Sequence, residues 1–279
     1  MNARPRRPIT LGIDFSGSAS QWLPRAAASS VWIARISGRS PKLLDLCRVQ
    51  DLPGDGAPFD RLTALLRSGD FDVAGIDAPF APPNGYFAGD RANLMDAVRA
   101  LPRAGRPFPT GMQLIALLAP NLAPRGRHVH RATEQHWRKR RINVRSVLWN
   151  GPRGGAPFAA ACFTLLAECG IPAWPWTRSG APRLAETFPA AQLRTWELPW
   201  FGYNGATPPA RQCRRKIVAG LLARTRLAIS DGQRTTMIAS ADALDSVICA
   251  LAARALALDA LTVAPGPEAE REGWIAIHR

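Results

Sequence analysis

The sequence lacks the features that mark membrane-embedded, secreted or zinc-stabilised proteins. Its longest uncharged stretch, residues 107–124, is interrupted by prolines, and its apolar centre at 114–119 is too short to span a membrane. The five cysteines form no Cys-x-x-Cys pair and show no zinc-ligand spacing, so we expect reduced thiols packed in the core. The basic first residues lead directly into a strand-like run, which is not typical of a secretory peptide. We therefore expect a cytoplasmic protein without a membrane partner.

Lysines and acidic residues are also scarce. The chain has 36 basic and 21 acidic residues, giving a formal net charge of +15, yet Lys42, Lys139 and Lys216 are its only lysines. GC-rich coding explains the preference for Arg over Lys, but not the shortage of acids. The excess favours a polyanionic partner, nucleic acid first, because each neutralised phosphate releases counterions. A hydrophobic content of 47% with 20% charged residues excludes a mainly disordered chain.

Alternating strand and helix patterns predict an α/β fold. We find no internal repeat and no flexible linker, so we expect one domain over residues 1–279, with a basic, helical insertion at about 81–150 where Pro and Gly are dense. Short β-branched or alternating runs predict strands at 9–14, 31–36, 43–49, 71–77 and 184–188, and an edge strand at 274–277. Apolar residues at helical spacing predict helices at 58–66, 91–101, 112–118, 130–141, 158–168, 210–225 and 241–258.

Two of the predicted strands end in the same tripeptide. Gly-Ile-Asp occupies residues 12–14 and again residues 75–77. In open α/β sheets, loops and helix N-termini converge beyond the carboxyl ends of the strands, so Asp14 and Asp77 could face one crevice. The competing interpretation is that each Asp opens a turn, which is a frequent role of this residue. For the matched pair, both interpretations stay open.

Further acids lie on the last long helix and on a late strand. Asp242 and Asp245 are three residues apart and share one helix face. The rest of that helix is nearly all apolar, which indicates burial with little solvated surface for its acids. Alternatively, both acids complement the helix dipole, which suits Asp242 better than Asp245. Glu186 lies in a strand-like segment, where an ordinary edge-strand acid is the simpler interpretation.

Taken together, these acids predict a metal site. Several carboxylates in one pocket repel one another unless a cation compensates their charge. Oxygen ligands of this kind suit Mg²⁺ or Mn²⁺. Two such ions could stabilise both the attacking and the leaving oxygen of phosphodiester hydrolysis. The candidate catalytic residues are Asp14, Asp77, Glu186, Asp242 and Asp245.

The order of short sequence blocks resembles that of a known family. The matching blocks are residues 12–17, 74–79, 186–190, 241–246 and 272–277, together with Lys216 followed by Arg224. The strand order, the terminal acids and the late Asp-x-x-Asp helix look like a ribonuclease-H-like fold. More closely, the chain resembles the predicted nuclease family known as domain of unknown function 429. This resemblance implies a ribonuclease-H-like mixed sheet flanked by helices, with Asp14, Asp77, Asp242 and Asp245 as metal ligands and Glu186 as a further ligand or an orienting group.

A strongly basic segment lies in the predicted insertion. Eight basic residues fall within residues 125–145, opposed only by Glu134, and they supply nearly half of the excess charge. Trp137 lies inside this run, where its ring could stack on a base, although a solvated helical face is the competing interpretation. A second basic cluster comprises Arg211, Arg214, Arg215 and Lys216. The candidate nucleic-acid contacts are Arg125, Arg127, Arg131, Trp137, Arg138, Lys139, Arg140, Arg141 and Lys216.

The sequence leaves several functions open. We favour a Mg²⁺- or Mn²⁺-dependent nuclease or phosphodiesterase, and the main alternative is a nucleic-acid-binding module of the same fold without catalysis. A phosphotransferase of the actin and sugar-kinase kind is suggested by residues 14–18, which resemble a phosphate loop, but we find only one set of strands and no Gly-rich adenosine segment. A separate metal site at His128, His130, Glu134 and His136 is disfavoured because His136 would face away on a helix.

Overall fold

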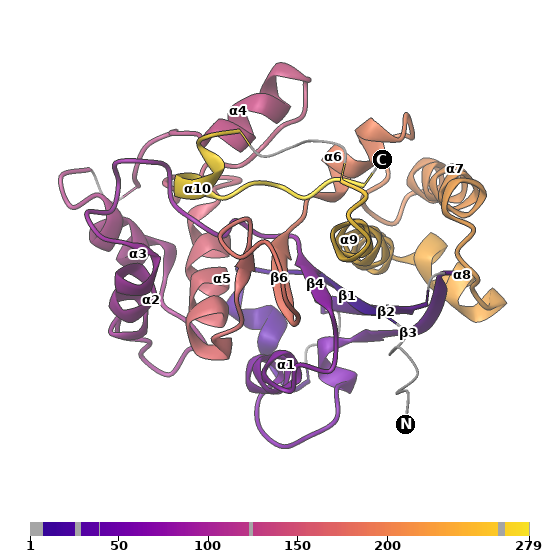
Figure 1. Cartoon of the computed structure of the whole chain (residues 1–279), viewed down its shortest axis with the longest axis horizontal. Coiled ribbons are helices and arrows are strands. Elements are labelled where there is room, and N and C mark those ends of the chain that lie inside the picture. Colours follow the sequence, from indigo (N-terminus) through magenta and orange to yellow (C-terminus); the bar gives the residue numbers. More distant parts are fainter. Residues whose placement is uncertain (1–7, 26–28, 39, 123–124, 262–265, 279) are drawn as a thin grey trace.

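The computed structural model describes residues 8–25, 29–38, 40–122, 125–261 and 266–278. Within these ranges the chain forms a mixed six-stranded sheet flanked by helices (Figure 1). The predicted α/β class with a mixed sheet is therefore confirmed. The strands are β1 (Ile9–Asp14), β2 (Trp32–Ser37), β3 (Lys42–Arg48), β4 (Val73–Ile76), β5 (Ala173–Trp174) and β6 (Arg183–Glu186).

The sheet changes from antiparallel to parallel pairing at β1. Its strand order is β3-β2-β1-β4-β6-β5, with antiparallel pairing among the first three strands and parallel pairing from β1 onward. The register pairs Ile13 with Ile76, and Ile76 with Glu186. The Asp77 amide donates a hydrogen bond to the Ile13 carbonyl oxygen at 3.0 Å. Asp14 and Asp77 therefore leave the sheet side by side at its carboxyl edge.

The predicted helices are all present, with ends that differ by a few residues. The sequence analysis missed the short helices α6 (Pro189–Thr195), α8 (Asp231–Ala239) and α10 (Ala269–Glu272). Only Ser240, which caps both helices, separates α8 from α9 (Ala241–Ala257). The 3₁₀ helices are η1 (Ala19–Trp22) and η2 (Val49–Asp51). The α-helices are α1 (Pro58–Arg67), α2 (Arg91–Arg99), α3 (Gly111–Leu118), α4 (Ala132–Lys139), α5 (Ala156–Cys169), α6 (Pro189–Thr195), α7 (Pro208–Thr225), α8 (Asp231–Ala239), α9 (Ala241–Ala257) and α10 (Ala269–Glu272).

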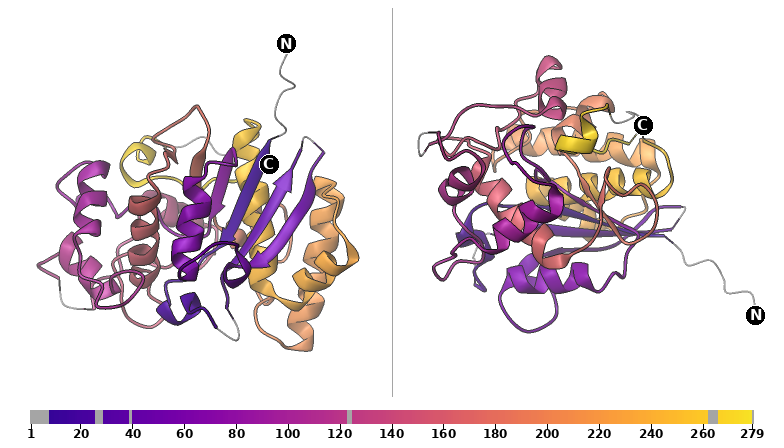
Figure 2. Two further views of the ribbon diagram at one scale, coloured as in Figure 1. Left: turned by 90° about the horizontal axis from the view of Figure 1, so that it is seen from below. Right: turned by 60° about the vertical axis from the view of Figure 1, so that its left-hand side comes forward.

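The helices form a layer on each face of the sheet (Figure 2). Helices α1 and α5 cover one face, where they bury Leu11, Ile13 and Ile76, and α2 and α3 pack against the outer side of α5. Helix α9 covers the other face and is itself covered by α7 and α8. Because side chains along a strand alternate between faces, the even-numbered residues of β1 point toward α9.

Two glycines allow α9 to lie unusually close to the sheet. A Cβ atom on Gly12 would lie 2.0 Å from the Ser246 carbonyl oxygen, and one on Gly75 would lie 2.5 Å from the Cys249 carbonyl oxygen. No side chain fits in this space, so β1 and β4 require glycine where α9 crosses them. The first turns of α9 precede this crossing and therefore lie beside the carboxyl ends of both strands.

The buried segment at residues 274–277 is not the predicted edge strand. Its backbone amides bind partners on different elements instead of one neighbouring strand. The Ile275 amide donates to Thr133 Oγ1 on α4 at 3.3 Å, and the Ala276 amide donates to the Glu186 carbonyl oxygen on β6 at 2.8 Å. No ladder forms because the segment crosses from one element to the next, as its yellow path in Figure 1 shows.

No single described helix is long and apolar enough to cross a membrane. Helices α8 and α9 meet these two criteria only as a pair, which is bent by 115°. Most residues of α9 are buried against the sheet and the neighbouring helices, so its apolar character is explained by its position in the core.

Candidate active site

Four aspartates from three elements meet at the carboxyl edge of the sheet. Asp14 ends β1, Asp77 directly follows β4, and Asp242 and Asp245 lie on the first two turns of α9. Asp14 is buried and the other three are partly exposed. The charges of Asp245, Asp77 and Asp242 all act on Asp14, so these three carboxyl groups lie within electrostatic range of it. The structure thus brings together the strand-end acids and the helix pair that the sequence singled out.

Burial and mutual repulsion disfavour the charged forms of these carboxyl groups. Loss of hydration is the largest cause for each of them. Burial raises the pKa of Asp77 to about 7, a rise that Arg145 opposes and Glu186 supports. Burial and the neighbouring aspartates raise the pKa values of Asp14 and Asp245 well above the ordinary Asp value. Without a compensating cation, the cluster therefore tends to retain protons near neutral pH, because its full negative charge is unfavourable there.

Nothing within the described residues neutralises this charge directly. None of the four aspartates forms an ion pair there. The Tyr203 hydroxyl donates a hydrogen bond to Asp245 Oδ1 at 3.0 Å, which is the direct polar contact that orients this carboxylate. Arg145 and Arg214 favour the charged carboxylates from a greater distance. An additional cation would therefore stabilise the cluster.

The donor chemistry of the cluster fits a hard divalent cation. Carboxylate oxygens of this kind are the ligands that Mg²⁺ and Mn²⁺ prefer. As the side chains stand, no three of the described His, Cys, Asp and Glu residues are arranged to hold one ion. The backbone positions of the four aspartates are fixed by the sheet and α9, so ligation would require rotation of their side chains.

The four aspartates line an open cleft of about 940 Å³. The cleft is also lined by the loop after β1, the N-terminus of α5, residues 141–145 and residues 200–205. Its volume lies near the upper end of the range for small-molecule pockets, roughly 300–1,000 Å³. The carboxylates are therefore accessible to an occupant larger than an ion and its waters.

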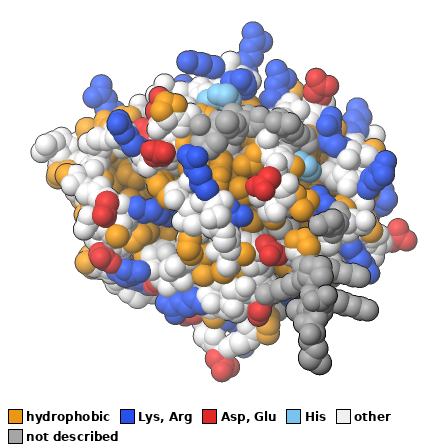
Figure 3. All heavy atoms as spheres, in the orientation of Figure 1, with side chains coloured by type: hydrophobic (Ala, Val, Ile, Leu, Met, Phe, Trp, Pro, Cys, Tyr) orange, Lys and Arg blue, Asp and Glu red, His pale blue; other side chains and the backbone are white. Residues whose placement is uncertain are grey.

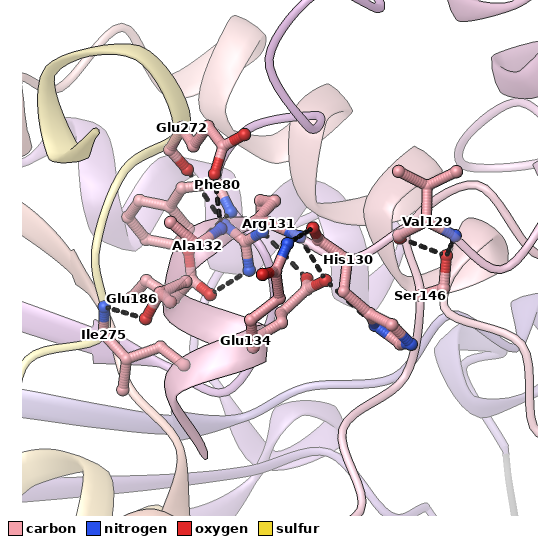
Figure 4. A network of polar contacts seen from close by, with 12 residues as sticks. Phe80, Val129, His130, Arg131, Ala132, Glu134, Ser146, Glu186, Glu272 and Ile275 are labelled. Atoms are coloured by element: carbon pink, nitrogen blue, oxygen red, sulfur yellow. Dashed lines mark hydrogen bonds and ion pairs between the residues drawn. The ribbon is translucent and has the colours of Figure 1, made fainter. Parts of the chain in front are cut away.

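Glu186 lies at the same edge of the sheet but belongs to a different network (Figure 4). Its carboxylate accepts hydrogen bonds from Arg131 Nη1 at 2.7 Å and Nη2 at 2.5 Å, and from the Phe80 amide at 3.0 Å. Arg131 Nε also donates to Glu134 Oε1 at 2.8 Å. Glu186 lies two residues after buried Leu184 and therefore on the same face of β6, so its side chain is on the α5 side of the sheet, opposite α9.

This arrangement bears on the two roles that the family resemblance implied for Glu186, a further metal ligand or an orienting group. Its two oxygens are engaged by a guanidinium and a backbone amide, so it is neutralised within the protein. Its charge still raises the pKa of Asp77, which lies nearby. Of the two roles that the family resemblance implied, the geometry favours an orienting group over a ligand.

Two of the predicted nucleic-acid contacts have buried side chains, which disfavours their direct contact with nucleic acid. Arg131 is 1% exposed and is held by Glu134 and Glu186. Trp137 is 3% exposed and packs in the small core that includes Ile142. The basic run therefore does not form one solvated helical face, because α4 buries these two side chains against the domain.

The remaining predicted contacts are exposed, but most lie outside the cleft. Arg141 lines the cleft, and it also lines a smaller adjoining hollow together with Arg138 and Lys139. Figure 3 shows basic side chains gathered at the top of the molecule, over α4. In the second basic cluster, Arg214 is buried and donates to backbone carbonyl oxygens. The other exposed predicted contacts are Arg125, Arg127, Arg140 and Lys216.

The histidines of the disfavoured alternative point to different partners. His130 Nδ1 lies 3.4 Å from Glu134 Oε2. His128 stacks on Trp149, with ring centroids 4.4 Å apart, whereas His136 packs against the rings of Trp137 and Trp274. These side chains do not converge, so the structure gives this alternative no support.

Residues 12–270 match the family model described as "Protein of unknown function (DUF429)". The chain belongs to the DUF429 family. The matched region includes both Gly-Ile-Asp tripeptides and the Asp-x-x-Asp of α9, and therefore all four clustered aspartates. No curated protein and no solved structure matches the chain.

The sequence analysis did not name Tyr203 or Arg145 as site residues. Tyr203 lies in a loop rich in Gly and Pro, where no periodicity marks a buried side chain. Arg145 was counted only as part of the basic segment, although its guanidinium lies 4.5 Å from the centre of the Phe158 ring in the cleft. Their proximity to the aspartates depends on contacts across the fold, which no local pattern reveals.

Proposed function

We propose that this protein is a metal-dependent nuclease or phosphodiesterase that hydrolyses phosphodiester bonds of nucleic acids. The observation that carries this proposal is the cluster of four aspartates that line an open cleft without an ion-pair partner in the described part of the chain. The net charge of +15 supports a polyanionic substrate.

A ribonuclease-H-like architecture is part of the same proposal. The order of three antiparallel strands followed by a parallel strand beside β1 supports it. So do the acids at the ends of β1 and β4 and the late helix that crosses both strands. These features bring acids that are distant in sequence to one edge of one sheet, where a phosphodiester could be reached from the cleft.

The proposed metal ligands are Asp14, Asp77, Asp242 and Asp245. When bound, Mg²⁺ or Mn²⁺ would polarise the phosphodiester and make water a better nucleophile. Tyr203 holds Asp245 through its hydroxyl group. Arg145 lines the cleft near Asp77, where its guanidinium could bind and orient a substrate phosphate.

A cleavage assay tests the proposal. Labelled single strands, duplexes, an RNA–DNA hybrid and a four-way junction would be incubated with Mg²⁺, Mn²⁺ or EDTA. We compare the wild type, Asp77→Asn and the exposed control Asp55→Asn. The expected result is metal-dependent cleavage by the wild type and Asp55→Asn, and a loss of at least roughly 10²–10³-fold in Asp77→Asn.

The assay also separates the alternatives. Equal cleavage by the wild type and Asp77→Asn would contradict the assignment of the site. Absence of cleavage, with salt-sensitive binding that is equal in both proteins, would instead identify a binding module of the same fold. Circular dichroism of Asp77→Asn confirms that any loss of activity is not a loss of folding.

A further inference from the structure

An exposed aromatic ring lines the cleft beside the carboxylate cluster. Phe201 is 72% exposed, and it lies in the loop that connects α6 to α7. Its ring packs edge-on against Trp200, with centroids 5.3 Å apart. The Arg194 guanidinium lies 4.0 Å from the centre of the Trp200 ring and supports it in turn. The Phe201 ring is therefore presented on a braced surface, with most of its area open to an occupant.

The loop that carries Phe201 is fixed relative to the aspartates. Two residues later, buried Tyr203 donates its hydroxyl hydrogen bond to Asp245. The buried Arg214 side chain donates to the Tyr203 carbonyl oxygen and, at 2.9 Å, to that of Gly205. Arg214 therefore shapes this loop from beneath and is not a surface contact. Because these contacts fix the loop, the ring and the carboxylates have a defined spacing.

Arginines line the part of the cleft near α5. Arg145 lies over the Phe158 ring on the first turn of α5, and it acts electrostatically on Asp77. Arg153 is exposed and lines the same cleft. Through Arg141, the cleft continues into the adjoining hollow lined by Arg138 and Lys139, so cations follow a path out of the site. Such a path suits a chain of phosphates rather than a single anion.

We propose that the cleft takes single-stranded nucleic acid, with a base stacked on Phe201 and neighbouring phosphates bound by Arg145 and Arg153. This inference rests on the proposed function and assigns its substrate class. Phosphate contacts alone would accept any nucleic acid, whereas stacking on a protein ring requires an unpaired base with a free face. A duplex keeps its base faces inside its own stack. The exposed ring is therefore the feature that selects a single strand.

Binding measured in EDTA tests this inference independently of catalysis. Fluorescently labelled oligothymidine and oligouridine of about 12 nucleotides, and a duplex of equal length, are titrated by anisotropy. The proteins are the wild type, Phe201→Ala, Phe201→Trp and the control Met112→Ala, a side chain on α3 that is 53% exposed and does not line the cleft. Phe201→Ala should weaken single-strand binding roughly 5- to 150-fold, whereas Phe201→Trp and Met112→Ala should retain it.

The Arg145→Ala variant and the comparison of the oligonucleotides decide between the possible outcomes. Arg145→Ala should weaken single-strand binding and reduce the slope of log affinity against log salt by about 0.7. Phe201-dependent binding of either strand supports the inference, and the relative affinities show which of the two oligonucleotides the cleft prefers. Equal single-strand binding by the wild type and Phe201→Ala, or tighter binding of the duplex that does not depend on Phe201, would overturn it.

The two proposals can fail separately. Phe201-dependent binding without metal-dependent cleavage of any substrate would leave the stacking inference intact and contradict the nuclease. Conversely, metal-dependent cleavage that is lost in Asp77→Asn but unchanged for single strands in Phe201→Ala would leave the nuclease intact and contradict the stacking.

Discussion

Two groups of acids lie at the same edge of the sheet, and they differ in how their charge is balanced. Glu186 and Glu134 share the guanidinium of Arg131. Glu272, next to them, accepts hydrogen bonds from two backbone amides at 2.5 and 2.6 Å. The four aspartates between β1, β4 and α9 have raised pKa values and form no ion pair in the described part of the chain. The first group stabilises the junction of α4, β6 and the C-terminal segment, whereas under the proposed function a bound divalent cation would balance the charge of the second.

Removing the cation of the paired group should have the largest effect on stability. Arg131→Met leaves Glu186 and Glu134 buried without a counterion. We expect the free energy of unfolding to fall by about 3–5 kcal/mol, measured by urea denaturation. The exposed control Arg138→Met should change it by no more than about 0.5 kcal/mol. Equal effects of the two variants would contradict the role assigned to Arg131.

Removing a charge from the aspartate cluster should change the free energy of unfolding in the opposite direction. In EDTA at pH 8, Asp77→Asn relieves the cost of holding a charged carboxylate at this site. We expect the free energy of unfolding to rise by about 1–2 kcal/mol, since one pKa unit corresponds to about 1.4 kcal/mol and partial exposure weakens the effect. Asp55→Asn serves as the control. Destabilisation by Asp77→Asn would show that the charge of this carboxylate is compensated within the protein.

The pH dependence of the free energy of unfolding should also differ between the wild type and Asp77→Asn. The folded protein holds the Asp77 proton to about pH 7, whereas an ordinary Asp has a pKa of 3.8. The folded state therefore binds more protons than the unfolded state between these values, and raising the pH through this window lowers its stability. Without metal, the wild type should lose about 1 kcal/mol more than Asp77→Asn between pH 5 and pH 8. Parallel pH profiles in denaturant titrations would argue against a raised Asp77 pKa.

The elements and the aspartates could be predicted because their signals are local. Alternation and helical spacing predicted the strands and long helices, and Asp242 and Asp245 share a face by spacing alone. The Gly-Ile-Asp tripeptides attracted attention for their acids, but their glycines are equally important. They let α9 pack so closely that its backbone oxygens would lie 2.0–2.5 Å from a Cβ atom at either glycine. Only the folded structure shows that the glycine and the aspartate of each tripeptide contribute to the same site.

The paired group could not be predicted because its partners are distant in sequence. Arg131 bonds to Glu186, 55 residues away, and to the Glu272 carbonyl oxygen, 141 residues away. A basic residue in a basic run therefore gave no sign that it was buried. The same limit applies to Phe201 and Tyr203, which lie in a loop without periodicity. Their importance comes from the carboxylates that the fold places beside them.

Calorimetric titration with Mn²⁺ tests the central claim most directly. The titration compares the wild type with Asp14→Asn and the control Asp55→Asn at pH 7.5. If the four aspartates form a binding site for a divalent cation, the wild type and Asp55→Asn should bind Mn²⁺ with equal affinity. Asp14→Asn should bind it at least roughly tenfold more weakly. Absence of Mn²⁺ binding by the wild type, or equal binding by Asp14→Asn, would contradict the account.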